Sequence, residues 1–128
     1  MAAAVLVVDD DPTLRRLLRF VLVTAGFAVE EAPDGRTALE RLRQHPASLV
    51  VLLDVQMPEV SGIEVMETVA SDPVLVTRHR YIVMTAATTL PLAFTNLLSK
   101  LQVPVLSKPF TADELLAQVG RADGSLQP

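Results

Sequence analysis

The sequence predicts an α/β fold in which a parallel sheet of five strands is doubly wound, with helices covering both faces. Short apolar runs alternate with segments of helical periodicity, which is the pattern of repeated strand–helix–strand units. Half of the residues are hydrophobic, yet only four Phe and one Tyr are present, so aliphatic side chains must fill the core. Such a composition suits a sheet that is buried on both faces. The 128 residues are enough for one domain with a single core.

Turn and capping residues set the boundaries of the expected elements. The apolar runs predict five strands, over residues 4–8, 27–31, 49–53, 81–85 and 103–106. The helical periodicity predicts one helix after each strand, over residues 12–25, 35–44, 62–70, 91–101 and 112–120. Asp11 before Pro12 is a helix start, and residues 61–64 and 111–114 have the form of capping boxes. Residues 72–80 are expected to form a connection without a helix.

Composition and charge narrow the class of protein. The net charge is −4 and only two of the 11 basic residues are lysines, which argues against a direct nucleic-acid surface. The chain has no cysteine, so disulfides and thiolate metal sites are excluded. No apolar run approaches the roughly 18 residues that a membrane span needs. We therefore expect a cytoplasmic protein, monomeric or weakly dimeric, with residues 1–121 as one domain and residues 122–128 as a flexible tail.

Charged and polar residues stand where the expected strands end. Asp9 and Asp10 follow the first strand, Asp54 follows the third, Thr85 ends the fourth and Lys108 lies just past the fifth. Ligands of an open parallel sheet bind outside the carboxyl ends of its strands, so these residues are the first candidates for function. Three carboxylates on one rim repel one another, and a hard cation such as Mg²⁺ relieves that repulsion.

The stretches around these residues resemble a known family. They read "VLVVDDDP" from residue 5, "LLDVQMPEVSG" from residue 52, "IVMTA" from residue 82 and "VLSKPF" from residue 105. Together they resemble the response-regulator receiver domain of bacterial two-component signalling, the CheY-like domain, over almost the whole chain. The resemblance implies a flavodoxin-like sheet with strand order 2-1-3-4-5 and five helices.

The resemblance implies a role for three of the residues at the strand ends. Asp54 would accept a phosphoryl group from the phosphohistidine of a sensor histidine kinase or a phosphotransfer protein. Thr85 would be the hydroxyl that moves on activation, and Lys108 the ammonium that meets the phosphoryl group. A cis peptide bond is expected between Lys108 and Pro109. The chain would then be a phosphoacceptor with chemistry of self-phosphorylation and dephosphorylation only, and not a turnover enzyme.

The resemblance also implies a Mg²⁺ site. Asp10 and Asp54 would bind the ion directly, Asp9 would act mainly through water, and the backbone carbonyl of Gln56 would be a further ligand. The chemistry agrees with these roles, since carboxylate and carbonyl oxygens suit a hard cation.

A partner surface is expected within residues 90–118. The helix over residues 91–101 has more apolar side chains than one buried face needs, which indicates either a surface for an output domain or protein, or a deeply packed helix. Receivers commonly have Tyr or Phe three residues before the lysine, but this chain has Val105. Because valine is small and stiff about its side-chain torsion, no aromatic flip can report activation here.

Three alternative functions are less well supported. An aspartyl-phosphate hydrolase would have a second acid where this chain has Gln56. A flavin or nucleotide binder would have a glycine-rich loop after the first strand, where this chain has three acids. An interaction module derived from a receiver would lack part of the set of acids, Thr and Lys, which is complete here.

The remaining polar and sulfur-containing residues are assigned to structure. Three arginines of the first helix are expected to form a solvated face, with contact to a kinase as the alternative: Arg15, Arg16 and Arg19. Two histidines, distant from each other and in loops, are not expected to be ligands or phosphoacceptors: His45 and His79. Three methionines are expected to pack in the core: Met57, Met66 and Met84.

Overall fold

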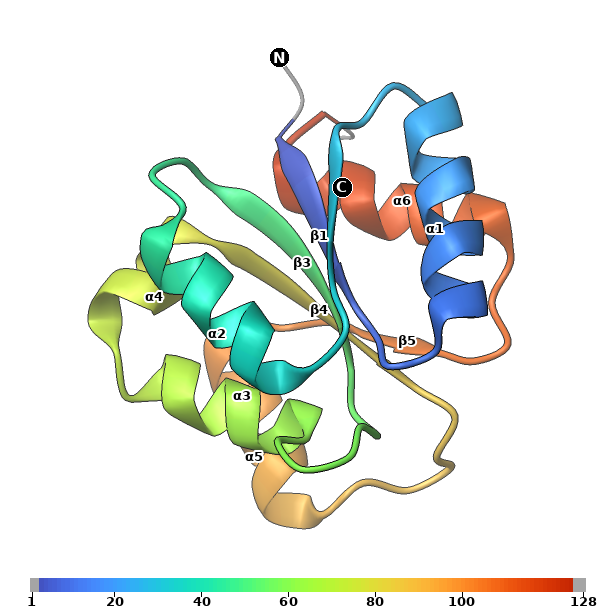
Figure 1. Cartoon of the computed structure of the whole chain (residues 1–128). Coiled ribbons are helices and arrows are strands. Elements are labelled where there is room, and N and C mark those ends of the chain that lie inside the picture. The colour runs from blue at the N-terminus through green and yellow to red at the C-terminus, as the bar shows by residue number, and fades with distance from the viewer. Residues whose placement is uncertain (1–2, 126–128) are drawn as a thin grey trace.

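A computed structural model describes residues 3–125 and contains one parallel sheet (Figure 1). Its strand order is β2-β1-β3-β4-β5, which confirms the predicted order. The strands are β1 (Ala4–Val8), β2 (Val29–Ala32), β3 (Leu49–Asp54), β4 (Arg80–Thr85) and β5 (Val105–Ser107). β3 is the central strand, and its Leu53 pairs with Val8 of β1.

Helices cover both faces of this sheet, as the doubly wound fold requires. They are α1 (Pro12–Thr24), α2 (Gly35–Gln44), α3 (Gly62–Ala70), α4 (Pro73–Arg78), α5 (Leu92–Leu101) and α6 (Ala112–Asp123). Figure 1 shows α1 and α6 on one face, and α2, α3 and α5 on the other. The core is divided in the same way, because alternate residues of a strand point to opposite faces. Leu6 and Val8 of β1 pack with the α2, α3 and α5 side, whereas Val5 and Val7 pack with α1 and α6.

The core consists mainly of aliphatic residues, as the composition indicates. Every residue of β3 is buried, in keeping with a central parallel strand. The three methionines predicted to be packing residues are buried as well: Met57, Met66 and Met84.

The helix count was wrong by one, because residues 72–80 contain the short helix α4. The side chain of Asp72 accepts hydrogen bonds from the backbone N–H groups of Val74 and Leu75, and Pro73 occupies the first turn. Leu75 is buried in the core and holds this six-residue helix against it. The start signal was present in the sequence, but six residues are too few to show helical periodicity.

Three boundaries differ from the prediction by two residues or more, and several others by one. β2 begins at Val29 and not at residue 27, because the backbone N–H of Phe27 bonds to the carbonyl of Leu22 at the end of α1. β5 begins at Val105 and not at residue 103, because the backbone N–H of Val103 donates to the carbonyl of Leu98 in the last turn of α5.

Helix α6 continues past Gly120 to Asp123, so the first residues of the expected tail are helical. Gly124, with a positive φ of 83°, ends the helix in the left-handed conformation that favours glycine. The last three residues of the expected tail, 126–128, lie outside the described residues. Within residues 3–125, no helix is both long and apolar enough to cross a bilayer.

Candidate functional site

The predicted site residues meet at the carboxyl ends of four strands. Asp54 is the last residue of β3, and Asp9 follows β1 directly. The pairing of Val8 with Leu53 therefore brings the two acids side by side. Thr85 ends β4, and the backbone N–H of Lys108 donates to the carbonyl of Thr85 over 2.8 Å, which joins the end of β5 to the same rim.

Three carboxylates converge here. Asp9 is only 1% exposed and Asp54 only 5%, whereas Asp10 is exposed. Each of the three can offer one carboxylate oxygen such that all three oxygens lie within 4.8 Å of one another. An all-oxygen donor set of this kind fits a hard divalent cation such as Mg²⁺. Gln56 follows Asp54 by two residues, and its carbonyl as a further ligand stays a prediction.

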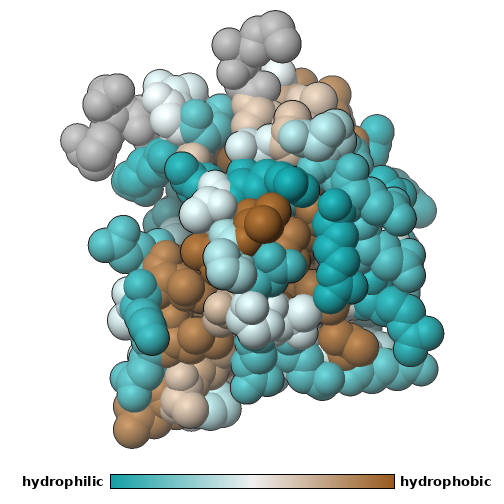
Figure 2. All heavy atoms as spheres, turned by 90° about the vertical axis from the view of Figure 1, so that its left-hand side faces the viewer, coloured by the Kyte–Doolittle hydropathy of each residue, from teal (hydrophilic) through white to brown (hydrophobic). Residues whose placement is uncertain are grey.

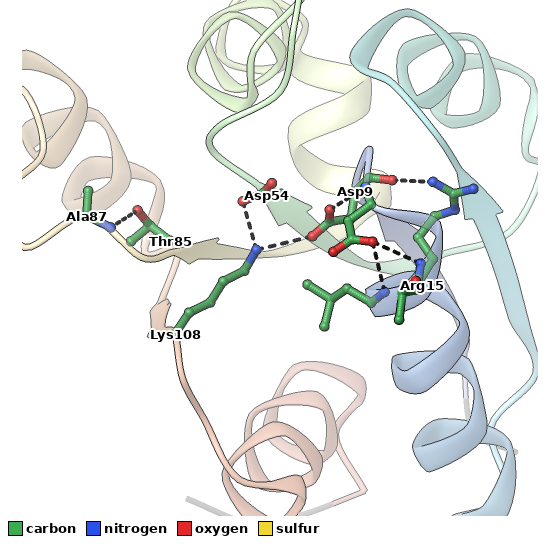
Figure 3. Close-up of polar contacts among 9 residues, drawn as sticks. Asp9, Arg15, Asp54, Thr85, Ala87 and Lys108 are labelled. Atoms are coloured by element: carbon green, nitrogen blue, oxygen red, sulfur yellow. Dashed lines mark hydrogen bonds and ion pairs between the residues drawn. The ribbon is translucent and has the colours of Figure 1, made fainter.

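The ammonium of Lys108 lies between two of these acids (Figure 3). Its Nζ donates to Oδ2 of Asp9 and to Oδ1 of Asp54, each over 3.2 Å. The Lys108 side chain keeps 22% exposure, so it reaches the buried acids from the surface. The cis peptide bond predicted between Lys108 and Pro109 is confirmed.

Burial and neighbouring charge set the proton affinity of this cluster. Desolvation raises the pKa of the Asp54 carboxyl, and the Asp9 carboxylate raises it further, while the Lys108 ammonium opposes both effects. Desolvation lowers the pKa of Lys108, but the charges and hydrogen bonds of Asp54 and Asp9 together outweigh it, so the pKa of Lys108 lies above its usual value. Lys108 therefore stays an ammonium and favours the ionised form of Asp54.

All the oxygens of Asp9 are engaged in hydrogen bonds. Oδ1 accepts from the backbone N–H of Asp11 over 2.9 Å, and Oδ2 accepts from Lys108. The backbone carbonyl accepts from a guanidinium N–H of Arg15 over 2.7 Å. By contrast, the exposed carboxylate of Asp10 makes no hydrogen bond within residues 3–125, which leaves it open toward solvent.

Thr85 is buried, and its hydroxyl is turned toward its own loop. Oγ1 accepts from the backbone N–H of Ala87 over 3.0 Å, and Figure 3 shows this contact apart from the Lys108 cluster. The structure thus places Thr85 on the same rim as the acids without a direct bond to them.

Only glycine fits at position 62, the last residue of the "VSG" stretch that follows Asp54 in the sequence. A Cβ at Gly62 would collide with the backbone carbonyl oxygen of Asp54 and with Cα of Val55. The N–H of Gly62 instead donates to the carbonyl of Val55 over 2.9 Å. The first residue of α3 therefore packs directly against the end of β3, and this close approach fixes the backbone that presents Asp54.

The prediction of a solvated arginine face was wrong for Arg15, whose side chain is only 17% exposed, and is confirmed for Arg19, which is exposed. Both bind Glu31 of β2, through Nε of Arg15 over 3.2 Å and a terminal nitrogen of Arg19 over 3.1 Å. Arg16 is exposed, as predicted. The spacing of Arg15 and Arg19 by four residues, with Glu31 in the neighbouring strand, was the available signal, but the pairing of β2 with β1 was needed to use it.

The two histidines are not distant from each other, which corrects that prediction. Their ring centroids lie 6.5 Å apart, and His79 is buried at the end of α4. Nδ1 of His79 accepts from the backbone N–H of Leu49 and Nε2 donates to the carbonyl of Leu42, which assigns a neutral ring. His79 is thus a buried structural residue that joins α2, β3 and α4.

Comparisons with known proteins agree with this geometry. The sequence-family model of the response regulator receiver domain matches residues 5–120 of this chain. Response regulator MprA of Mycolicibacterium vanbaalenii is 37% identical over 123 residues, which cover 93% of this chain and 49% of the relative. Transcriptional regulatory protein KdpE of Mycobacterium tuberculosis is 33% identical over 127 residues, covering 92% of this chain and 50% of the relative. The chain thus spans about half the length of these curated relatives.

Solved structures show the same fold. A CheY-like response regulator receiver domain protein from Methanospirillum hungatei superposes with a TM-score of 0.83 at 26% identity, covering 96% of this chain and 95% of the other. The chemotaxis protein CheY4 of Vibrio cholerae gives a TM-score of 0.80 at 28% identity, covering 95% of this chain and 99% of the other.

Proposed function

The chain belongs to the response regulator receiver domain family, and on that basis we propose that Asp54 accepts a phosphoryl group from the phosphohistidine of a sensor histidine kinase or a phosphotransfer protein. One observation supports this most directly. A nearly buried carboxylate ends the central strand β3, with an ammonium 3.2 Å away and two more carboxylates beside it. Such an arrangement suits a nucleophile that must receive, and then hold, a group with several negative charges.

Asp54 and Lys108 would carry out the transfer. An Oδ atom of Asp54 forms the new O–P bond as the P–N bond of the donor breaks, and the imidazole nitrogen of the donor keeps the bonding electron pair. Lys108 already donates to Oδ1 of Asp54, so its ammonium is in place to pair with the phosphoryl oxygens. The domain is a phosphoacceptor with self-phosphorylation and dephosphorylation chemistry, since water on the acyl phosphate restores the Asp54 carboxylate.

Asp10 and Asp54 would hold Mg²⁺ directly, with Asp9 acting through water and the carbonyl of Gln56 as a further ligand. When bound, Mg²⁺ supplies a hard Lewis acid that neutralises charge on the phosphoryl oxygens. The hydrogen bonds of Asp9 support its indirect role, because Asp11 and Lys108 already occupy both carboxylate oxygens. The open carboxylate of Asp10 supports a direct role.

The phosphodonor would reach Asp54 from the side of α1 and α6, in the cytoplasm. A groove of about 450 Å³ lies between these helices, and it is lined mainly by apolar residues together with Lys108. Leu17, which lines this groove, and Phe20, also on α1, are both exposed, Phe20 by 69%. Because the groove adjoins the lysine that contacts Asp54, an amphipathic helix of the donor docked there would hold its histidine near the acid.

The output surface would lie within residues 90–118. Leu92 at the start of α5 is 75% exposed, and Val105 on the edge strand β5 is also exposed. Figure 2 shows the side of the molecule that bears α4, and apolar atoms gather on its lower part, at the height where Figure 1 places α5. Movement of Thr85 on phosphorylation would pass to α5 through residues 86–91, since Val105 has no ring to rotate.

Intact mass spectrometry after incubation with acetyl phosphate and Mg²⁺ tests this proposal. We expect the mass of one phosphoryl group on the wild-type chain and none on Asp54→Asn, with Asp113→Asn as a control because Asp113 is exposed in the first turn of α6. Equal labelling of the Asp54→Asn and Asp113→Asn variants would refute the assignment of Asp54. Repeated turnover of a phosphomonoester by the wild-type chain would favour a hydrolase instead.

A further inference from the structure

Arg15 connects the first helix to the acidic rim through the backbone. A guanidinium N–H donates to the carbonyl oxygen of Asp9 over 2.7 Å, the shortest side-chain contact at this site (Figure 3). The backbone N–H of Arg15 donates to the carbonyl of Asp11 over 3.0 Å. One residue of α1 therefore binds both ends of the three-residue segment that contains Asp9 and Asp10.

The position of the Arg15 guanidinium is itself fixed. Nε donates to Oε1 of Glu31 over 3.2 Å, and Arg19, one turn further along α1, binds the other oxygen of Glu31. The Arg15 side chain is only 17% exposed. A planar guanidinium can donate to a carboxylate and to a carbonyl at the same time, which the single ammonium of lysine does poorly. The β2 strand thus orients Arg15 toward the end of β1.

We propose that Arg15 is a positioning residue for the acidic site: by holding the carbonyl of Asp9, it fixes the peptide that joins Asp9 to Asp10 and so the directions of both carboxylates toward a divalent cation. This inference rests on the proposed Mg²⁺ site. Asp9 has its two carboxylate oxygens bound as well, so the hydrogen bond from Arg15 completes its immobilisation. The exposed side chain of Asp10 makes no hydrogen bond or ion pair within the described part of the chain, so its direction depends on this peptide.

Electrostatics and positioning predict opposite changes in cation affinity when Arg15 is removed. The direction of that change therefore tests the inference. Arg15 is a cation near three carboxylates, so its removal should strengthen cation binding if electrostatics dominate. If positioning dominates, its removal should weaken cation binding, because the ligands lose their common orientation. Outer residues that orient metal ligands typically change metal affinity by about 10-fold to 100-fold when they are replaced.

The experiment is a titration of the whole chain with Mg²⁺ alone, by calorimetry and by NMR. We expect Arg15→Gln to raise the Mg²⁺ dissociation constant about 10-fold, and Arg15→Lys to raise it less, since lysine keeps one donor for the carbonyl. Arg19→Gln is the matched control: it removes the same charge and a bond to the same Glu31, but it does not contact Asp9. Its dissociation constant should stay unchanged or fall slightly.

Two readouts separate positioning from a general loss of stability. In the metal-free protein, the Asp9 carbonyl carbon and the Asp10 amide should shift in Arg15→Gln and not in Arg19→Gln. The labelling rate from acetyl phosphate should recover at saturating Mg²⁺, so that only the Mg²⁺ concentration for half-maximal rate changes. If Arg15→Gln does not fold, the Arg15→Lys variant replaces it, with a rise of a few-fold expected.

Three results would overturn the inference: Mg²⁺ affinity equal to that of Arg19→Gln, tighter binding in Arg15→Gln, or unchanged signals of Asp9 and Asp10. Failure of the proposed function is distinguishable, because a wild-type chain without Mg²⁺ affinity refutes the metal site itself. The carbonyl shift of Asp9 tests the Arg15 contact in either case.

Discussion

Removing the ammonium of Lys108 should destabilise the metal-free protein by about 2–3 kcal/mol at pH 7. Lys108 makes two contacts of 3.2 Å, with carboxylates of Asp9 and Asp54 that are almost inaccessible to solvent. At an effective dielectric constant of about 20, each such contact is worth about 5 kcal/mol before desolvation. Loss of one partner of a fully buried pair costs about 3–5 kcal/mol, and we reduce this because Lys108 is 22% exposed.

The test uses Lys108→Met, which keeps an apolar side chain against the groove between α1 and α6. The control is Lys100→Met, because Lys100 is the other lysine of the chain and is exposed on α5. Urea denaturation at pH 7 gives both free energies of unfolding. Saturating Mg²⁺ should stabilise Lys108→Met more than the wild type, because the cation then no longer shares the carboxylates of Asp54 and Asp9 with an ammonium.

The pH dependence provides a second check on the same variant. The pKa of Asp54 is raised in the folded state, so ionised Asp54 costs stability at neutral pH, and this cost disappears as the pH falls through the folded pKa. Without Lys108 the cost is larger, so the difference between variant and wild type should shrink as the pH is lowered. If Lys108→Met lowers the free energy of unfolding by less than about 0.5 kcal/mol, or by as much as Lys100→Met does, the two ion pairs of Lys108 contribute no more than exposed ion pairs.

Three further predictions address other parts of the fold and site. Burial lowers the pKa of His79 from 6.5, so stability should fall as the pH drops below 6.5 by at most about 1.4 kcal/mol per pH unit, and His79→Gln should flatten this slope in denaturation curves. Gly62→Ala should cost about 1–3 kcal/mol in urea denaturation, because its Cβ meets two backbone atoms, and a cost near zero would contradict the rigid contact of α3 with β3. Asp10→Ala should weaken Mg²⁺ binding more than Asp9→Ala does in calorimetry, and equal losses would count against a direct role for Asp10 alone.

Much of the fold follows from local patterns. The alternation of apolar runs with helical segments predicted the five strands and a parallel sheet, because the central strand β3 is buried on both faces and the helices other than α5 begin at a side-chain cap. Asp11 and Ser61 cap α1 and α3 as the sequence indicated. The location of Asp54 at a strand end was predictable for the same reason, since a charged residue that directly follows a run of buried aliphatic residues marks the carboxyl end of a strand.

Short elements and long-range pairs were not predictable in this way. Helix α4 is too short for periodicity, and it is stable because Leu75 enters the core. His79 looked like a loop residue, yet it bonds to α2 and β3, which are 37 and 30 residues away in the chain. Contacts between segments so distant in sequence leave no local pattern.

The sequence alone determines which chemical groups stand at the rim: carboxylates, a hydroxyl and an ammonium at the ends of strands. The order of the strands in space determines how they act together. β1 lies beside β3, so Asp9 meets Asp54, and the end of β5 brings Lys108 to within 3.2 Å of both. Likewise, β2 lies beside β1, so Glu31 can orient Arg15 toward the carbonyl of Asp9. Charges separated by up to 99 residues in the chain share one site because folding pairs the strands, and the energies of these contacts depend on burial that no local stretch of sequence specifies.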